Sequence, residues 1–222
     1  MLPELGLKGQ EALARASVLV VGAGGLGSPI SLYLCSAGIG RLGLIDGDIV
    51  SESNLQRQVL YTEAEVGQPK TACAARSLSA HNSRCVIETY ACFLTEENAE
   101  EIISRYDIVV DGCDNFAARY LIDDCCARMG KPYVYGSIMG LRGQASVFNG
   151  GRARRYQDLY VDRAALSARP KAAAGVIGPT PAVVGSIEAA EVIKIVTGCG
   201  EPLYNRLFTI DLATMTSDTL DL

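Results

Sequence analysis

The stretch VLVVGAGGLGSPISLYLCSAGIGRLGLIDGD, residues 18–48, decides the fold. It begins with an apolar run of strand length, continues with apolar residues at helical spacing up to Ala37, and returns to a second apolar run that ends at Asp46. The turn between the first strand and the helix carries a G-x-G-x-x-G pattern that includes Gly22, Gly24, Gly25, Leu26 and Gly27. Glycines in such a turn let backbone amides approach a phosphate group. The stretch therefore predicts a strand, turn and helix that bind a nucleotide.

The same alternation of strand and helix patterns continues over the rest of the chain. We expect further strands at residues 85–90, 107–113, 132–136, 144–148, 206–211 and 215–220, and further helices at 69–80, from Thr95 with Glu96 and Glu97 in the first turn, from about 115 to Met129, and at 182–196. Apolar strands without alternation indicate a parallel sheet covered on both faces. The expected fold is α/β: a Rossmann-like, doubly wound, mainly parallel sheet that continues into antiparallel strands at the C-terminal side. Residues 1–222 would form a single domain with a polar, arginine-rich crossover loop at 149–174.

Composition and charge argue against several classes of protein. The chain has 222 residues, a formal charge of −5 and no long basic run, so nucleic acid is not expected as a partner. It has neither an apolar stretch of membrane-spanning length nor a basic-then-apolar leader after Met1, so we expect a cytoplasmic protein without a membrane partner. The eight cysteines form no C-x-x-C pair and lie mostly in apolar or helical runs, which favours structural roles over a disulfide framework.

The residues behind the glycine turn indicate which nucleotide is bound. Asp46 ends the second strand, where a carboxylate accepts hydrogen bonds from a ribose hydroxyl, and this placement fits NAD and ATP alike. The segment up to the next helix adds further polar and charged groups, namely Asp48, Asn54, Arg57, Gln58 and Lys70. A dinucleotide pyrophosphate needs fewer such groups, whereas they stabilise the charge of a reacting triphosphate. ATP is therefore favoured, and an ordinary solvated loop is the alternative.

Asp114 is a second feature that favours ATP. It follows the fourth strand, which in the usual order of such sheets lies beside the first, across the point where ligands bind. A carboxylate over the phosphates suggests a Mg²⁺ ligand. Asn115 and Arg119 follow on the first turns of the next helix. They either orient Asp114 and reach the substrate or serve as a helix cap and surface charge.

Four segments carry a resemblance to a known family: the glycine turn, SNLQRQ at residues 53–58, VVDGCDNFAARYLID at 109–123, and AAGVIGPTPAVVGSIEAAEVIKIVTG at 173–198. Together they make the chain similar to the MoeB/ThiF/HesA family, the prokaryotic relatives of ubiquitin-activating enzymes, over nearly its whole length. The resemblance implies an adenylyltransferase that uses ATP and Mg²⁺. It would activate the C-terminal glycine carboxylate of a small ubiquitin-like sulfur carrier protein, which ends in Gly-Gly, as an acyl-adenylate and release pyrophosphate.

The resemblance also assigns roles to residues and segments. Arg57, Lys70 and Asp114 would be catalytic, with Asp114 as the magnesium ligand. The nucleotide would be bound by Gly22, Gly24, Gly25, Leu26, Gly27, Asp46, Asp48, Asn54, Arg57, Gln58, Lys70, Asp114 and Asn115. Residues 1–136 would form the nucleotide-binding part and residues 137–222 the carrier-binding part of a chain that acts as a homodimer.

Three features common in the family do not appear in this sequence. An R-Y-x-R-Q element, whose arginine reaches the neighbouring subunit's ATP site, does not precede Leu2. The two C-x-x-C pairs that hold zinc are absent, with Arg155–Asp158 at the place of the first, so no zinc site is expected. Lys171 stands where many relatives have the cysteine used for covalent transfer, so we expect adenylation without a thioester step.

Two other functions remain open. A non-catalytic or regulatory relative would keep nucleotide or carrier binding without turnover. An NAD(P)-dependent oxidoreductase would use the same glycine turn for a dinucleotide. These residues do not distinguish between thiamine, molybdopterin and other sulfur-transfer pathways.

Overall fold

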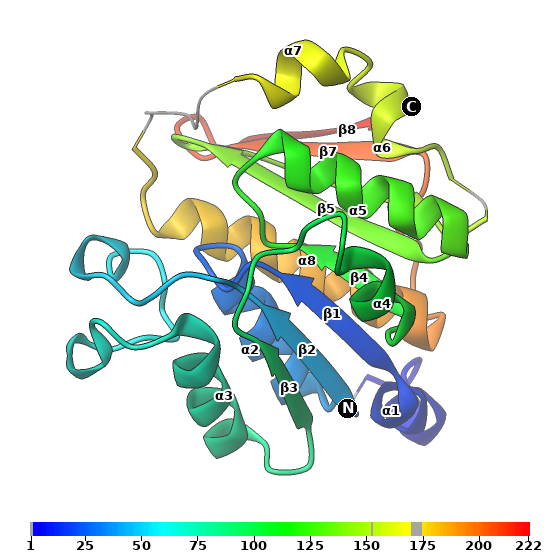
Figure 1. Ribbon diagram of the computed structural model, residues 1–222. Helices are drawn as coiled ribbons and strands as arrows, with labels where there is room; N and C mark the ends of the chain where they lie inside the picture. Colours follow the sequence, from blue (N-terminus) through cyan, green and yellow to red (C-terminus); the bar gives the residue numbers. More distant parts are fainter. Residues whose placement is uncertain (1, 152, 170–174) are drawn as a thin grey trace.

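A computed structural model describes residues 2–151, 153–169 and 175–222. They contain a sheet of eight strands in the order β3-β2-β1-β4-β5-β6-β7-β8 (Figure 1). The strands are β1 (Ser17–Val21), β2 (Arg41–Ile45), β3 (Val86–Tyr90), β4 (Ile108–Asp111), β5 (Pro132–Met139), β6 (Arg142–Asn149), β7 (Arg206–Asp211) and β8 (Thr216–Asp221). The helices are α1 (Gly6–Arg15), α2 (Gly27–Ala37), α3 (Lys70–His81), α4 (Ala99–Ser104), α5 (Phe116–Met129), α6 (Tyr156–Leu159), α7 (Arg163–Ser167) and α8 (Pro179–Thr197), with 3₁₀ turns η1 (Glu52–Asn54) and η2 (Glu63–Glu65).

Strand β1 lies at the centre of the parallel half of the sheet. It pairs in parallel with β2 on one side and with β4 on the other, and β3 and β5 extend this half outward. All its residues are buried because helices cover both faces of the sheet. The carboxyl ends of β2, β1 and β4 therefore meet at one edge, with the glycine turn in the middle. The expected doubly wound arrangement is confirmed.

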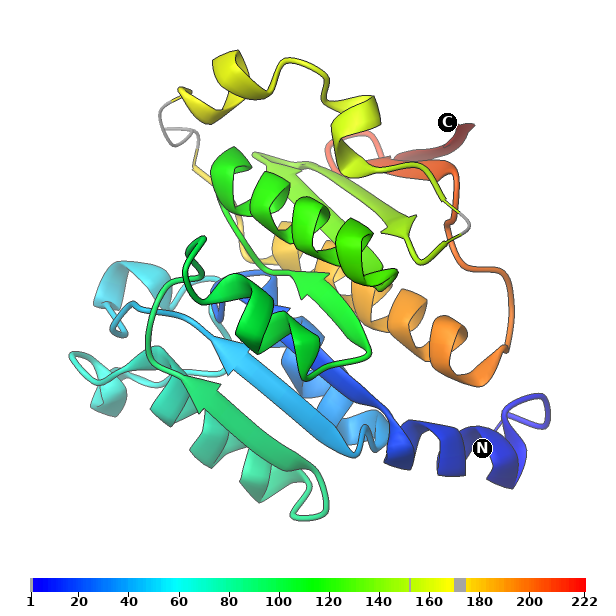
Figure 2. The same ribbon diagram turned by 45° about the vertical axis from the view of Figure 1, so that its right-hand side comes forward.

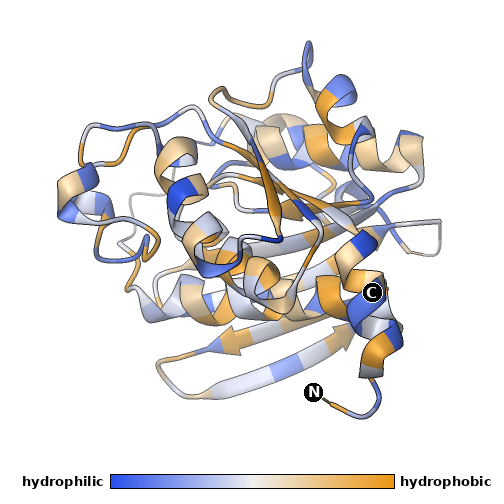
Figure 3. Ribbon diagram, turned by 90° about the horizontal axis from the view of Figure 1, so that it is seen from below, coloured by the Kyte–Doolittle hydropathy of each residue, from blue (hydrophilic) through white to orange (hydrophobic). Residues whose placement is uncertain are grey.

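Two hydrophobic clusters lie on opposite faces of this sheet. One packs helices α2, α3 and α8 against alternate strand residues such as Val20 and Val110. The other packs α4 and α5 against the neighbouring residues Leu19 and Val109. Figure 2 shows the helices on the two sides of the sheet, and Figure 3 shows orange hydrophobic segments on the strands between them. None of the described helices combines the length and the apolar character needed to cross a bilayer.

The C-terminal strands form the antiparallel half of the same sheet. β5 pairs with β6, β6 with β7 and β7 with β8, all antiparallel. This confirms the expected change from parallel to antiparallel pairing. Strand β8 is an edge strand whose six residues are all exposed.

Two helices at the periphery differ from the sequence expectation. The sequence pattern does not predict α1, which is held by tertiary contacts: Leu13 is buried, and Gln10 Nε2 donates a hydrogen bond to the carbonyl of Ala37 at 2.9 Å. The expected helix start at Thr95 is wrong, because the Thr95 amide donates to Asn98 Oδ1 at 2.8 Å and closes a turn over residues 96–98. Helix α4 follows that turn, so Glu100 and Glu101, rather than Glu96 and Glu97, occupy its first turn.

The crossover expected as a loop at residues 149–174 is partly helical, since α6 and α7 lie within it. Asp123 on α5 is fully buried and accepts hydrogen bonds from the Tyr156 amide at 2.9 Å and from the Arg155 guanidinium at 3.1 Å. Partners on a distant helix leave no periodic signal in the sequence, so these short helices could not be expected from it. Helix α8 also begins three residues earlier than expected, with Pro179 in its first turn. Lys171 lies outside the described residues.

Candidate nucleotide-binding site

The glycine turn after β1 is packed against the turn after β4. Gly22 has a φ of 97°, which only glycine adopts without strain. A Cβ atom on Gly22 would lie 2.6 Å from the carbonyl oxygen of Gly112, and a Cβ on Gly27 would overlap the carbonyl of Gly22. Both positions thus need glycine for space, and the turn leads directly into α2. The structure places the predicted G-x-G-x-x-G pattern between strand and helix, the context in which it binds phosphate.

Asp46 and Tyr61 hold this turn from two sides. Asp46 Oδ2 accepts a hydrogen bond from the Ala23 amide at 2.8 Å, and Asp46 Oδ1 accepts one from the Asp48 amide at 2.8 Å. The Tyr61 hydroxyl donates to the Ala23 carbonyl at 2.6 Å. Burial, together with the nearby charge of Asp46, raises the pKa of Tyr61, so its hydroxyl stays protonated as a donor. Each oxygen of Asp46 keeps a second acceptor position, which a ribose hydroxyl can use.

Lys70 and Asp48 form an ion pair on the α3 side of the turn. Lys70 Nζ lies 3.0 Å from Asp48 Oδ2, and the side chain of Lys70 is 5% exposed whereas that of Asp48 is 54% exposed. The Lys70 amide also donates to the Asp48 carbonyl at 3.0 Å. Two of the predicted site residues are therefore brought together, with the ammonium group held inside the site and its partner at the rim.

The SNLQRQ segment forms a compact turn beside the glycines. The amides of Arg57 and Gln58 both donate to the carbonyl of Asn54, at 3.1 and 3.0 Å. The side chain of Arg57 is partly buried and passes close to Gly25: a Cβ on this glycine would lie 3.6 Å from Arg57 Cδ. Gln58 is buried, and its Oε1 has no hydrogen-bond partner among the described residues. Gln58 Nε2 lies on the side of the glycines, since a Cβ on Gly24 would lie 3.6 Å from it. A cationic side chain and an amide donor thus border the glycine turn, and both can bind phosphate oxygens.

The turn after β4 presents Asp114 at the surface, and buried side chains hold this turn in place. Asp114 is exposed, and Asn115 caps α5 by accepting a hydrogen bond from the Ala118 amide at 2.9 Å. Arg119 is buried, with its Nε 2.8 Å from Asp111 Oδ2, and it also donates to the Cys113 carbonyl at 3.0 Å. The interpretation of Arg119 as surface charge is therefore wrong. Burial disfavours the charged form of Arg119, but the Asp111 carboxylate and the surrounding tyrosines, Tyr135, Tyr133 and Tyr156, together outweigh it, and the pKa of Arg119 is raised well above its usual value.

Several residues of this region are not predicted from the sequence. Tyr61 and Asp111 support the two turns, and Glu188 on α8 lies against Gly136 of β5, where any side chain would overlap its carboxyl group. Glu188 is fully buried, and neither oxygen has a hydrogen-bond partner in the part of the chain that the structure describes. Burial raises the pKa of Glu188 well above its usual value. Of these three residues, only Asp111 could have been found from the sequence, because it is a charged residue at the end of an apolar strand. No local pattern marks Tyr61 or Glu188 as part of this region.

The end of the crossover contacts the SNLQRQ segment and the glycine turn. Gln56 Nε2 donates to the carbonyl of Val176 at 3.2 Å, and Pro181 in the first turn of α8 lies close to Gly25. A separate hollow of about 210 Å³ lies on the antiparallel half, lined by Arg142, Gly143, Gln144, Thr209, Ile210, Asp211, Thr216 and Asp218. Its lining includes the ion pair of Arg142 and Asp211 but no glycine turn of the kind found after β1. The turns after β1, β2 and β4 are therefore the candidate nucleotide site.

The donor set fits a magnesium ion that is shared with phosphates. Within residues 2–151, 153–169 and 175–222, no group of three or more His, Cys, Asp or Glu side chains could hold a metal by itself. Mg²⁺ is commonly bound by one or two carboxylates together with phosphate oxygens and water. The exposed carboxylate of Asp114 is suited to that arrangement, which does not need a cage of protein ligands.

Comparisons with known proteins agree with this geometry. The chain matches the ThiF family over residues 1–222. It is 48% identical over 217 residues to a sulfur carrier protein adenylyltransferase of Thermus thermophilus, which covers 95% of this chain and 80% of that protein. It is 44% identical over 225 residues to the probable adenylyltransferase/sulfurtransferase MoeZ of Mycobacterium tuberculosis, which covers 99% of this chain and 57% of MoeZ. The chain thus spans only about half the length of some relatives.

A solved structure shows the same fold. The crystal structure of Escherichia coli MccB with ATP superposes with a TM-score of 0.82 at 26% identity, covering 97% of this chain and 66% of that chain. MccB bound to MccA-N7isoASN gives a TM-score of 0.86 at 25% identity, with the same coverage of both chains. Together with the match over the whole length and the glycine turn described above, these likenesses show that the chain belongs to the ThiF family.

Proposed function

We propose that the protein is an ATP-dependent adenylyltransferase that activates the C-terminal glycine carboxylate of a small ubiquitin-like sulfur carrier ending in Gly-Gly. Membership of the ThiF family and the 48% identity to a sulfur carrier protein adenylyltransferase support this proposal. The observation that carries it is the glycine turn, which is pinned by Asp46 and Tyr61 beside the Lys70 and Arg57 cations.

The reaction requires alignment and charge neutralisation rather than a general base. A carboxylate oxygen of the carrier attacks the α-phosphorus of ATP, a new oxygen–phosphorus bond forms, and the bond to the β-phosphate oxygen breaks. Pyrophosphate leaves with the electron pair, and no proton moves. In this scheme the backbone amides of the glycine turn position the phosphates. Arg57 and Lys70 neutralise the charge that grows on the leaving pyrophosphate.

The remaining polar residues would position the ribose and a metal ion. Asp46 would accept hydrogen bonds from the ribose, and the amide groups of Asn54, Gln58 and Asn115 lie on the turns around the phosphates. Asp114 would hold Mg²⁺, which lowers the negative charge of the triphosphate when bound. The buried pair of Arg119 and Asp111 keeps the Asp114 turn in place.

The carrier would bind the second part of the chain, residues 137–222. The contact between Gln56 and Val176 places the end of the crossover directly over the SNLQRQ turn, so a carrier tail beneath the crossover would meet the nucleotide. We also propose a homodimer and a cytoplasmic location. All eight cysteines are free thiols, which is the usual state in a reducing compartment.

We propose further that adenylation proceeds without a thioester. Cys113, next to Asp114 in the sequence, is the thiol beside the Asp114 turn, and its Sγ donates to the Val21 carbonyl at 3.3 Å. Burial, reinforced by Asp111, raises the pKa of the Cys113 thiol well above its usual value, so it is a poor nucleophile.

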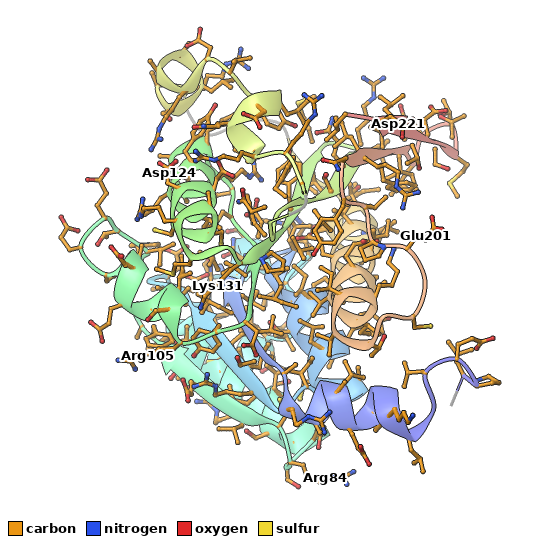
Figure 4. The ribbon with its side chains drawn as sticks, turned by 90° about the vertical axis from the view of Figure 1, so that its right-hand side faces the viewer. Arg84, Arg105, Asp124, Lys131, Glu201 and Asp221 are labelled. Carbon is orange, nitrogen blue, oxygen red and sulfur yellow. The ribbon has the colours of Figure 1, made fainter. Side chains whose placement is uncertain are left out.

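The test is carrier-dependent exchange of labelled pyrophosphate into ATP, with a small panel of Gly-Gly carriers. Exchange is expected only when a suitable carrier is present, and it should be lost in Asp114→Asn and Arg57→Ala. Glu11→Gln on the exposed face of α1 and Arg84→Ala, which is exposed in the turn before β3 (Figure 4), are the matched controls and should retain it. Exchange that survives both site substitutions would contradict the assignment of the site.

The same samples separate the alternative functions. A non-catalytic relative would bind ATP or carrier without forming an acyl-adenylate detectable by mass spectrometry. A dinucleotide oxidoreductase would be stabilised against heat by NAD(H) or NADP(H), whereas the proposed enzyme should be stabilised by ATP with Mg²⁺.

A further inference from the structure

An exposed aromatic ring lies at the edge of the nucleotide site. The side chain of Phe93, in the loop after β3, is 60% exposed, although a phenylalanine normally gains by burial. Its ring covers Gly47: a Cβ atom at residue 47 would lie 2.8 Å from both Cδ2 and Cε2 of Phe93. One side of the ring therefore rests on the backbone next to Asp46, and the remaining surface faces solvent.

The backbone that carries this ring is fixed. Asn98 Nδ2 donates a hydrogen bond to the Phe93 carbonyl at 2.9 Å, and Asn98 Oδ1 accepts one from the Thr95 amide at 2.8 Å. The next side chain, Leu94, packs on the hydrophobic cluster beneath α4 and α5. The ring is thus presented by an ordered loop, so its exposure is built into the fold.

The position of the ring relative to the ribose site suggests its use. Strand order β3-β2-β1 places the end of β2 between the glycine turn after β1 and the loop after β3. If Asp46 at the end of β2 accepts the ribose and the glycine turn holds the phosphates, the base extends from the ribose toward β3. The Asp46 amide donates to the Tyr90 carbonyl at 3.2 Å, so the two strand ends are in direct contact there.

We propose that Phe93 is the residue on which the adenine ring of ATP stacks, with Gly47 leaving the space that the phenyl ring occupies. This inference rests on the proposed nucleotide site. Stacking on an aromatic side chain binds the face of the base, so it adds affinity for a nucleotide and none for phosphate alone. The substitution Phe93→Ala should weaken ATP binding about tenfold and leave tripolyphosphate binding unchanged. Phe93→Tyr should keep the affinity for ATP.

The chain contains no tryptophan, which allows a direct optical test. Phe93→Trp introduces a single indole at the site, and its fluorescence should be quenched when ATP is added but unchanged with tripolyphosphate. Leu220→Trp is the control, because Leu220 has a similar exposure of 53% and lies on β8, at the opposite edge of the sheet from β3. Its emission should not respond to ATP.

A second variant tests the contact with Gly47. Gly47→Ala would place a methyl group against the phenyl ring and displace it, so ATP binding should weaken while tripolyphosphate binding remains. Calorimetry of ATP binding to the same proteins separates a failure of the role of Phe93 from a failure of the proposed function. ATP binding with no fluorescence response in Phe93→Trp, and with full affinity in Phe93→Ala, would overturn the role of Phe93 alone. Failure of the unsubstituted protein to bind ATP would overturn the proposed function and this role with it.

Discussion

Lys70 Nζ lies 3.0 Å from Asp48 Oδ2, with the lysine almost fully buried and the aspartate half exposed. The pair places a positive charge beside the proposed phosphate site and lets its partner remain hydrated, which limits the cost of burying the ammonium group. A lysine held in this way needs no reorganisation when a phosphate arrives.

This ion pair predicts that substitutions of Lys70 and of Asp48 have different effects on the kinetics. Lys70→Ala removes the charge that would neutralise the leaving pyrophosphate, so carrier-dependent exchange should fall about a hundredfold or more. Asp48→Asn keeps the charge but releases the ammonium group from its fixed position, so the KM for ATP should rise about tenfold with a smaller fall in kcat. Lys8→Ala on the exposed face of α1 is the matched control. Equal loss in Asp48→Asn and Lys70→Ala would show that Asp48 acts on the substrate itself.

Tyr61 offers a test of the glycine turn. The substitution Tyr61→Phe removes the donor to the Ala23 carbonyl and leaves that buried oxygen without its partner. The expected loss is about 1 kcal/mol of stability, or roughly 2–4 °C in Tm for a chain of this size, together with weaker ATP binding. Tyr33→Phe, at an exposed position on α2, should leave both quantities unchanged. A Tyr61→Phe protein with normal Tm and affinity would mean that Asp46 alone holds the turn.

The parts of this site that could be predicted from the sequence are those that depend on neighbouring residues. The glycine turn, the SNLQRQ segment and the order of strands follow from local patterns, and each was found where the sequence placed it. Arg119 shows the limit of such reasoning. Its position near the start of a helix suggested a cap or a surface charge, because the burial that pairs it with Asp111 depends on Tyr133 and Gly136 of β5.

Phe93 and the crossover helices illustrate the same limit. An exposed phenylalanine is visible in the sequence only as one apolar residue in a loop, and its meaning depends on Gly47, which is far away along the chain. The helices α6 and α7 likewise depend on partners on α5. Contacts of this kind are tertiary, so neither periodicity nor spacing reports them.

The burial of Glu188 predicts an unusual dependence of the protein's stability on pH. Its pKa is raised in the folded state, so folding favours the protonated form. In the unfolded chain a glutamate has a pKa of about 4.3. Stability contributed by protonated Glu188 is therefore complete below about pH 4 and is lost as pH rises toward the pKa of the folded state. Glu188→Gln removes this loss, so its Tm should exceed that of the unsubstituted protein by an amount that grows from pH 5 to pH 8.

Glu191, one turn further along α8, is the matched control. It is also buried, but it accepts a hydrogen bond from the Leu203 amide at 2.7 Å and forms an ion pair with Lys194. Glu191→Gln breaks an ion pair, so it should lower Tm at neutral pH. A Glu188→Gln protein that loses stability to the same extent would show that Glu188 is ionised and has a partner.

The ion pairs of Asp124 are expected to hold the crossover in place. Its carboxylate, on α5 (Figure 4), pairs with Arg155 and Arg163, both at 2.6 Å. These pairs tie the segments around α6 and α7 to α5. Asp124→Asn weakens both pairs while the fully buried Asp123 keeps its bonds to the Tyr156 amide and to Arg155. Trypsin should then cut the crossover several times faster, and the KM for the carrier should rise while the Kd for ATP stays the same.

High salt should produce the same change in the unsubstituted protein, because it screens partly exposed ion pairs. Glu11→Gln on the exposed face of α1 should leave proteolysis and the KM for the carrier unchanged. If Asp124→Asn weakens ATP binding as strongly as carrier binding, the crossover contributes directly to the nucleotide site rather than to the carrier alone.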